Sequence, residues 1–104
     1  MTYTVVFSAA AETDLFAIYD YIAERAGHAI ALRFVESIEL YCRGFKDTPE
    51  RGTRRDELRP GLRTVGFHRR ATILFEVDRD AHMVVVHGVY YAGRSLQGWT
   101  DESD

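Results

Sequence analysis

Residues 15–45 read LFAIYDYIAERAGHAIALRFVESIELYCRGF, and this stretch decides the fold. Two apolar stripes with helical spacing follow one another in it. They consist of Leu15, Ile18, Tyr19, Ile22 and Ala26, then Ile30, Phe34, Ile38 and Cys42. Gly27 between them suits the end of a helix. Because the turn around Gly27 and His28 is too short for a crossover, the stripes predict two helices folded back as an antiparallel hairpin.

A strand is expected before the hairpin, over Thr2–Phe7, because large apolar side chains stand there at every second position. Ser8 follows this strand directly. Its hydroxyl can accept from a free amide of the first helical turn, so Ser8 is the expected N-cap. The first helix should then run to about Ala26.

Three further strands are expected after the hairpin. Pro49 and Gly52 break the helical pattern. Alternating segments joined by short turns follow, at Leu62–Phe67, Ala71–Val77 and Met83–Tyr91. The last two are apolar in both alternating sets, which is typical of central strands. The sequence therefore predicts an α+β fold: an opening strand, an antiparallel helical hairpin and a three-stranded antiparallel meander, forming one antiparallel sheet packed on the helices.

Size and composition predict one domain over residues 1–104, since 46% hydrophobic residues can build a single core. The acidic end, residues 100–104, is expected to be flexible. Cys42 is the only cysteine, so no internal disulfide can form and a reducing cytoplasm fits best. The sequence has no long uninterrupted apolar run, and neither export nor membrane spanning is expected. No cofactor is expected either.

The charge is unevenly distributed along the chain. The formal net charge is −3, which argues against a general nucleic-acid binder, and no direct sequence-specific nucleic-acid binding is expected. Between Arg51 and Arg70, however, seven arginines face two acidic residues, so this window carries +5 and the rest −8. Two interpretations stay open. The arginines either form a surface for an anionic partner, or are solvated and paired, with Arg54, Arg55 and Arg70 beside Asp56, Glu57 and Glu50.

No pattern in the sequence assigns a catalytic or metal-binding residue. The four histidines lack the spacing of a zinc motif, and no serine stands in a nucleophile motif. His87 interrupts the apolar run Val84–Val86, and it is either a histidine at the core edge held by a hydrogen bond or a general base. Tyr90 and Trp99 either bind a partner or cover the sheet edge.

Three ordered segments carry a resemblance to a known family: PERG at 49–52, ELRPGLR at 57–63 and VHGVYYAGR at 86–94. In this order they resemble the ParE branch of the RelE/ParE superfamily of toxins, over nearly the whole chain. The resemblance implies the toxin of a type II toxin–antitoxin system, neutralised by a ParD-like antitoxin whose C-terminal segment wraps around it. It also implies DNA gyrase as the target.

Relatives of the RelE type instead cleave mRNA on the ribosome and depend on a basic cluster. Lys46 is the only lysine here, so that set is incomplete and gyrase inhibition is favoured over enzymatic activity. If the chain were a ribonuclease, Arg63, His87 and Tyr90 would be its site. A non-toxic interaction module is the third alternative. An acidic antitoxin tail would meet guanidinium groups and aromatics; the residues expected to bind antitoxin or target are Arg59, Arg63, Arg69, Tyr90, Tyr91, Arg94, Leu96 and Trp99.

Overall fold

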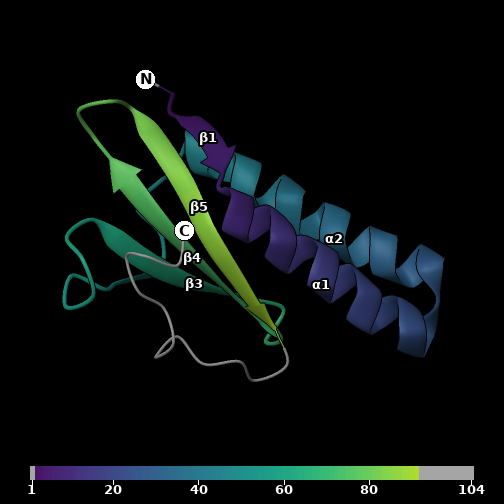
Figure 1. Cartoon of the computed structure of the whole chain (residues 1–104). Coiled ribbons are helices and arrows are strands. Elements are labelled where there is room, and N and C mark those ends of the chain that lie inside the picture. Colours follow the sequence, from purple (N-terminus) through teal and green to yellow (C-terminus); the bar gives the residue numbers. More distant parts are fainter. Residues whose placement is uncertain (1, 92–104) are drawn as a thin grey trace.

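A computed structural model describes residues 2–91 of the chain, which form two helices against one sheet (Figure 1). The elements in chain order are β1 (Thr4–Phe7), α1 (Ala9–Ala26), α2 (His28–Arg43), the 3₁₀ helix η1 (Gly44–Lys46), β2 (Thr53–Arg54), β3 (Leu62–Phe67), β4 (Ala71–Asp78) and β5 (Met83–Tyr91). The expected α+β fold, with its helical hairpin followed by a meander, is confirmed.

The two helices form the predicted hairpin and lie side by side (Figure 1). Ser8 caps α1, because its hydroxyl accepts a hydrogen bond from the amide of Ala11 at 3.1 Å. Gly27 alone joins α1 to α2, and its φ of 94° lies in the region that favours glycine. Over the part of the chain that the structure describes, neither helix combines the length and apolar character needed to cross a bilayer.

The sheet has the order β1-β5-β4-β3-β2. β3, β4 and β5 pair antiparallel, and β4 and β5 are central, as predicted. The expectation of a wholly antiparallel sheet is wrong, because β1 pairs parallel with β5. Both strands start at the same end, where the Tyr3 amide donates to Lys46 and the Thr4 amide donates to His82. β2 was not predicted, since two residues are too short for a periodic pattern.

The core lies between the helices and the face of the sheet that they cover. Phe45 of η1 stacks on Phe75 of β4 with a ring-centroid distance of 4.2 Å. Both rings are fully buried, together with Ile38 of α2 and Cys42. Burying a large apolar side chain contributes roughly 1.5–3 kcal/mol, so this layer supplies much of the driving force for folding.

β5 contains one extra residue relative to β4. The register pairs Leu74 with Gly88 and then Phe75 with Val86, which makes His87 the extra residue of a β-bulge. A bulge bends the strand and redirects the side chains that follow it. The redirection is essential here, because it sets which face of the sheet each later residue of β5 occupies.

The bulge keeps the core continuous along β5. Val84 and Val86 belong to the core cluster before the bulge, and Val89 and Tyr91 belong to it afterwards. In a regular strand the period of two would instead have turned Gly88 and Tyr90 toward the helices. Tyr90 therefore lies on the opposite face, called the outer face below.

Candidate functional site

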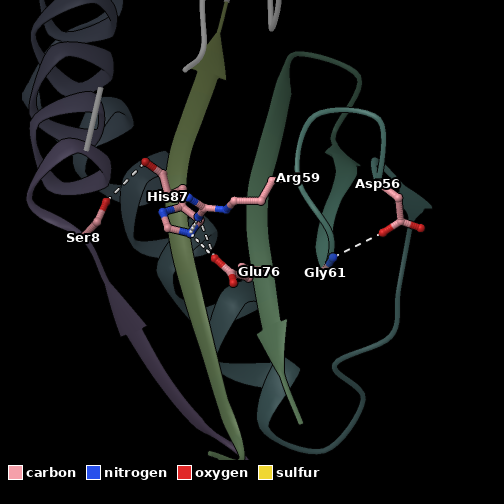
Figure 2. A network of polar contacts seen from close by, with 6 residues as sticks. All are labelled: Ser8, Asp56, Arg59, Gly61, Glu76 and His87. Carbon is pink, nitrogen blue, oxygen red and sulfur yellow. Dashed lines mark hydrogen bonds and ion pairs between the residues drawn. The ribbon is translucent and has the colours of Figure 1, made fainter. Parts of the chain in front are cut away.

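Three polar side chains from distant parts of the chain meet on the outer face (Figure 2). Arg59 comes from the loop before β3, Glu76 from β4 and His87 from the β5 bulge. Arg59 Nη2 lies 2.7 Å from Glu76 Oε1, and His87 Nε2 lies 2.9 Å from the same oxygen. The two nitrogens are 3.1 Å apart. We call these three residues the outer-face triad.

A hydrogen on Nε2 of His87 is the tautomer that suits the contact with the carboxylate. Arg59 can only donate, and ionised Glu76 can only accept. The arrangement that serves both contacts with the carboxylate has Nε2–H of His87 and Nη2 of Arg59 donating to one oxygen. His87 is buried at 7% exposure, whereas the side chains of Arg59 and Glu76 are 27% and 29% exposed. His87 is thus a buried donor beneath a solvent-accessible ion pair, as a histidine at the core edge would be.

The bulge is held in place from the start of α1. The hydroxyl of Ser8 donates to the carbonyl of His87 at 3.2 Å (Figure 2). A carboxylate oxygen of Asp14 accepts from the amide of Val89 at 3.0 Å. Because β1 ends at Phe7, these side chains satisfy backbone groups of β5 that a longer neighbouring strand would have paired.

The loop that carries Arg59 is closed by hydrogen bonds between its own residues. Asp56 accepts from the amide of Gly61 at 3.2 Å (Figure 2) and from Arg54 Nε at 3.0 Å. The Gly61 hydrogen bond, followed by Arg54, holds the pKa of the Asp56 carboxyl below its usual value. Gly61 has a φ of 90°, which lets the chain turn directly into β3. The loop therefore presents Arg59 from a defined position.

Pairing within the arginine window partly follows the solvated interpretation. Arg54 pairs with Asp56 and Arg55 with Glu57, as expected. Glu50, which was expected to pair with Arg70, instead forms an ion pair with Arg79. Arg70 lines a cleft between the helical hairpin and the β3–β4 turn.

The structure separates the residues that a ribonuclease site would bring together. Arg63 pairs with Phe75 in the sheet and so shares the helix-covered face, where its Nε donates to the carbonyl of Arg51 at 2.9 Å. His87 and Tyr90 belong to the outer face, where Tyr90 packs on the buried pair Leu62 and Leu74. The three candidates do not share one face.

The other predicted binding residues lie at one end of the sheet or outside the description. Arg69 is exposed in the β3–β4 turn with a φ of 61°. Tyr91 is buried, with its ring edge-on to Tyr21 and Phe34 at centroid distances of 5.6 and 5.5 Å. Arg94, Leu96, Trp99 and the acidic end 100–104 lie outside the described residues.

A second candidate surface is a cleft of about 700 Å³ between the helical hairpin and the β3–β4 turn. Its apolar part includes the exposed side chains of Tyr21 and Ile30. Its cationic part comes from α1, α2 and the turn. The residues lining it are Tyr21, Ile22, Arg25, Ala26, Ile30, Arg33, Phe34, Ser37, His68, Arg70 and Tyr91.

Sequence reasoning missed Glu76, although it is the centre of the triad. A signal existed, because Glu76 is a charged residue inside the otherwise apolar segment Ile73–Val77. Metal binding finds no support in residues 2–91, where no three His, Cys, Asp or Glu side chains gather closely enough to hold an ion.

Comparison with known proteins agrees with this architecture. The model of the family described as "ParE toxin of type II toxin-antitoxin system, parDE" matches residues 5–94. No curated protein matches the chain. Among solved structures, a chain of the chromosomal ParDE toxin–antitoxin system from P. aeruginosa has a TM-score of 0.74 and 23% identity, covering 88% of this chain and 97% of its own.

Two further solved structures share the fold at lower similarity. A chain of the RelBE2 toxin–antitoxin complex from Mycobacterium tuberculosis has a TM-score of 0.68 and 21% identity, with 90% of this chain and 95% of that chain covered. The isolated E. coli RelE toxin has a TM-score of 0.60 and 15% identity, with 91% and 89% covered. With the family model matching most of its length, the chain belongs to the ParE toxin family of type II toxin–antitoxin systems.

Proposed function

We propose that this toxin is held inactive by direct binding of a ParD-like antitoxin and that, when free, it inhibits DNA gyrase without catalysing a reaction. Family membership supports the first part, and so do two structural neighbours that were solved as parts of toxin–antitoxin systems. The observation that carries the antitoxin proposal is the cleft between the helices and the β3–β4 turn.

The cleft has the chemistry that an acidic, amphipathic peptide segment needs. Tyr21 and Ile30 are 40% and 51% exposed, so apolar side chains of a partner would remove costly surface from water. Arg33 and Arg70 line the same cleft and offer guanidinium groups to carboxylates. Apolar anchors surrounded by complementary charge are the usual composition of a helix-in-groove interface.

Charge reversal on the cleft tests the antitoxin proposal. The probe is the ParD-like antitoxin that the resemblance implies, purified separately. We expect Arg33→Glu with Arg70→Glu to slow association at least about tenfold and to weaken its salt dependence, because complementary charge steers encounter. Arg43→Glu with Lys46→Glu, both exposed and outside the cleft lining, is the matched control because it reverses the same number of charges. Equal association rates for the two variants would contradict the proposal.

The arginines first expected to bind antitoxin are less suitable for this test. Arg59 contacts Glu76 and His87, and Arg63 donates to a backbone carbonyl. A charge reversal at either position would disturb the fold as well as any interface. Arg33 and Arg70 therefore separate binding from stability more cleanly.

The position of Arg63 argues against the ribonuclease alternative. A ribonuclease site of Arg63, His87 and Tyr90 would need all three near one phosphate, but Arg63 lies on the other face.

Induced expression in a bacterium, with DNA breaks and protein synthesis followed together over the first minutes, tests the target. Early breaks with continuing translation support gyrase inhibition. Early arrest of translation with intact DNA contradicts it and supports the ribonuclease alternative. Unaffected growth, with folded protein present, contradicts both and supports a non-toxic interaction module.

A further inference from the structure

One carboxylate oxygen on the outer face receives donors from two separate parts of the chain. Arg59 reaches Glu76 Oε1 from the loop before β3 at 2.7 Å, and His87 reaches it from the β5 bulge at 2.9 Å. Guanidinium and imidazole groups that converge on one anionic oxygen are a common way to bind oxyanions. We propose that Arg59 and His87 form a binding site for a phosphate group, and that Glu76 occupies this site from within.

His87 and the backbone of the loop that carries Arg59 are held in position by other parts of the fold. His87, the bulge residue, is 7% exposed, and its own carbonyl accepts a hydrogen bond from Ser8. The loop of Arg59 is closed by the hydrogen bond from the Gly61 amide to Asp56. A site whose donors are fixed before the ligand arrives loses little conformational entropy on binding.

A tetrahedral anion fits these donors better than the carboxylate that they now hold. Arg59 Nη2 and His87 Nε2 are only 3.1 Å apart, because both aim at the same oxygen of a planar group. A phosphate group offers several oxygens in different directions, so each donor could take its own. Arg55 adds a second guanidinium near this face, fixed by its Nε bond to Thr64 Oγ1 at 3.1 Å.

Glu76 therefore acts as a built-in competitor of the external anion. Its side chain is 29% exposed, and the proposal requires it to turn outward toward solvent when phosphate binds. In the wild type, phosphate must displace the Glu76 carboxylate, and this exchange sets the affinity for phosphate. The site lies on the face of the sheet opposite the helices and is separate from the cleft proposed for the antitoxin.

The test is a titration of the full chain with inorganic phosphate at constant ionic strength, followed by the NMR signals of the His87 ring. We expect Glu76→Ala to bind phosphate at least about tenfold more tightly than wild type. Glu76→Gln should lie between them, because its neutral amide still accepts but competes less. Adding Arg59→Gln to Glu76→Ala should abolish the gain. Asp80→Ala removes the same charge from the exposed turn between β4 and β5 and is the matched control.

Three results would overturn the proposal. Equal affinity of Glu76→Gln and wild type would overturn the proposal, as would an equal gain in the Asp80→Ala control. If Glu76→Ala does not fold, the comparison of Glu76→Gln with wild type decides. Acetate binding as tightly as phosphate would also overturn it, since the site would then prefer a carboxylate. A short single-stranded oligonucleotide that competes with phosphate would identify nucleic-acid backbone as the source of the phosphate, and failure to compete would identify free phosphate or phosphate monoesters.

Discussion

Asp14 of α1 accepts a hydrogen bond from the backbone amide of Val89 in β5, and this contact joins the helical layer to the strand just beyond the bulge. Gly88 lies between the bulge residue His87 and Val89. A Cβ added at Gly88 would stand 3.2 Å from the Asp14 carboxylate. A side chain at this position would therefore crowd the Asp14 carboxylate. Asp14 therefore fixes how β5 continues after His87.

Replacing Asp14 with alanine should destabilise the protein by about 1–3 kcal/mol, because a half-buried amide loses its acceptor. Asp14→Asn should cost less, since an amide oxygen can still accept. Chemical denaturation measures both. Asp20→Ala, an exposed acid on the same helix, is the control and should change stability by less than about 0.5 kcal/mol. A loss in Asp14→Ala no larger than in this control would contradict the assigned role.

Replacing three glycines with alanine allows the cost of backbone strain and the cost of steric clash to be compared. At Gly52 the φ is 73° and an added Cβ would lie 2.0 Å from the carbonyl oxygen of Thr64. Gly27 has a φ of 94° with open space around it, and Gly66 has open space without a positive φ. Gly52→Ala should therefore destabilise by more than about 2 kcal/mol, Gly27→Ala by about 1 and Gly66→Ala by less than about 0.5. Thermal or denaturant unfolding gives the order, and a different order would contradict this account.

The only cysteine should be unreactive while the protein is folded. Burial, with a smaller effect of Glu39, raises the pKa of the Cys42 thiol to about 12. The thiolate is the reactive form. A disulfide reagent at pH 8 should therefore modify Cys42 rapidly only after denaturant is added, and rapid labelling of the native protein would contradict the prediction.

The same raised pKa makes stability depend on pH in a definite direction. The unfolded thiol ionises near pH 8.5 and the folded one near 12, so the contribution of Cys42 is complete below about pH 8 and is lost as the pH rises toward 12. Between pH 7 and 10, wild type should lose more stability than Cys42→Ala does. Parallel losses in the two proteins would contradict this.

Local patterns predicted most of the elements. The stripes on α1 and α2, the cap at Ser8 and the limits of β3 and β5 follow from periodicity and short-range chemistry. The parallel pairing of β1 with β5 joins residues about 80 positions apart and has no local signal. Only contacts formed in the folded chain decide it.

The bulge shows why the site was harder to predict than the fold. The sequence contained a sign of the bulge, because the core residues of β5 change from even to odd numbers between Val86 and Val89. That change was interpreted as a strand apolar on both faces. His87 was singled out, but its partners come from a loop and from β4. Which acid meets which base depends on register, and register is set by tertiary packing.

The hydrogen bond between Asp56 and Gly61, which closes the loop before β3, can be measured directly. The hydrogen bond from the Gly61 amide, followed by the contact with Arg54, lowers the pKa of this carboxyl. A lowered pKa means that the contribution is present above the ordinary Asp value near 3.9 and is lost as the pH falls through the lower folded value. The Gly61 amide signal in NMR should therefore shift with a midpoint below pH 3.9.

Two variants test whether that signal reports the loop closure. In Asp56→Ala the acid titration of the Gly61 amide should disappear, and its hydrogen exchange should become faster because its acceptor is gone. In Asp56→Asn the titration should also disappear, but exchange should stay slower, since the side-chain oxygen can still accept. If the Gly61 amide titrates unchanged in Asp56→Asn, another carboxylate closes the loop. Arg59 would then owe its position to a contact other than the one between Asp56 and Gly61.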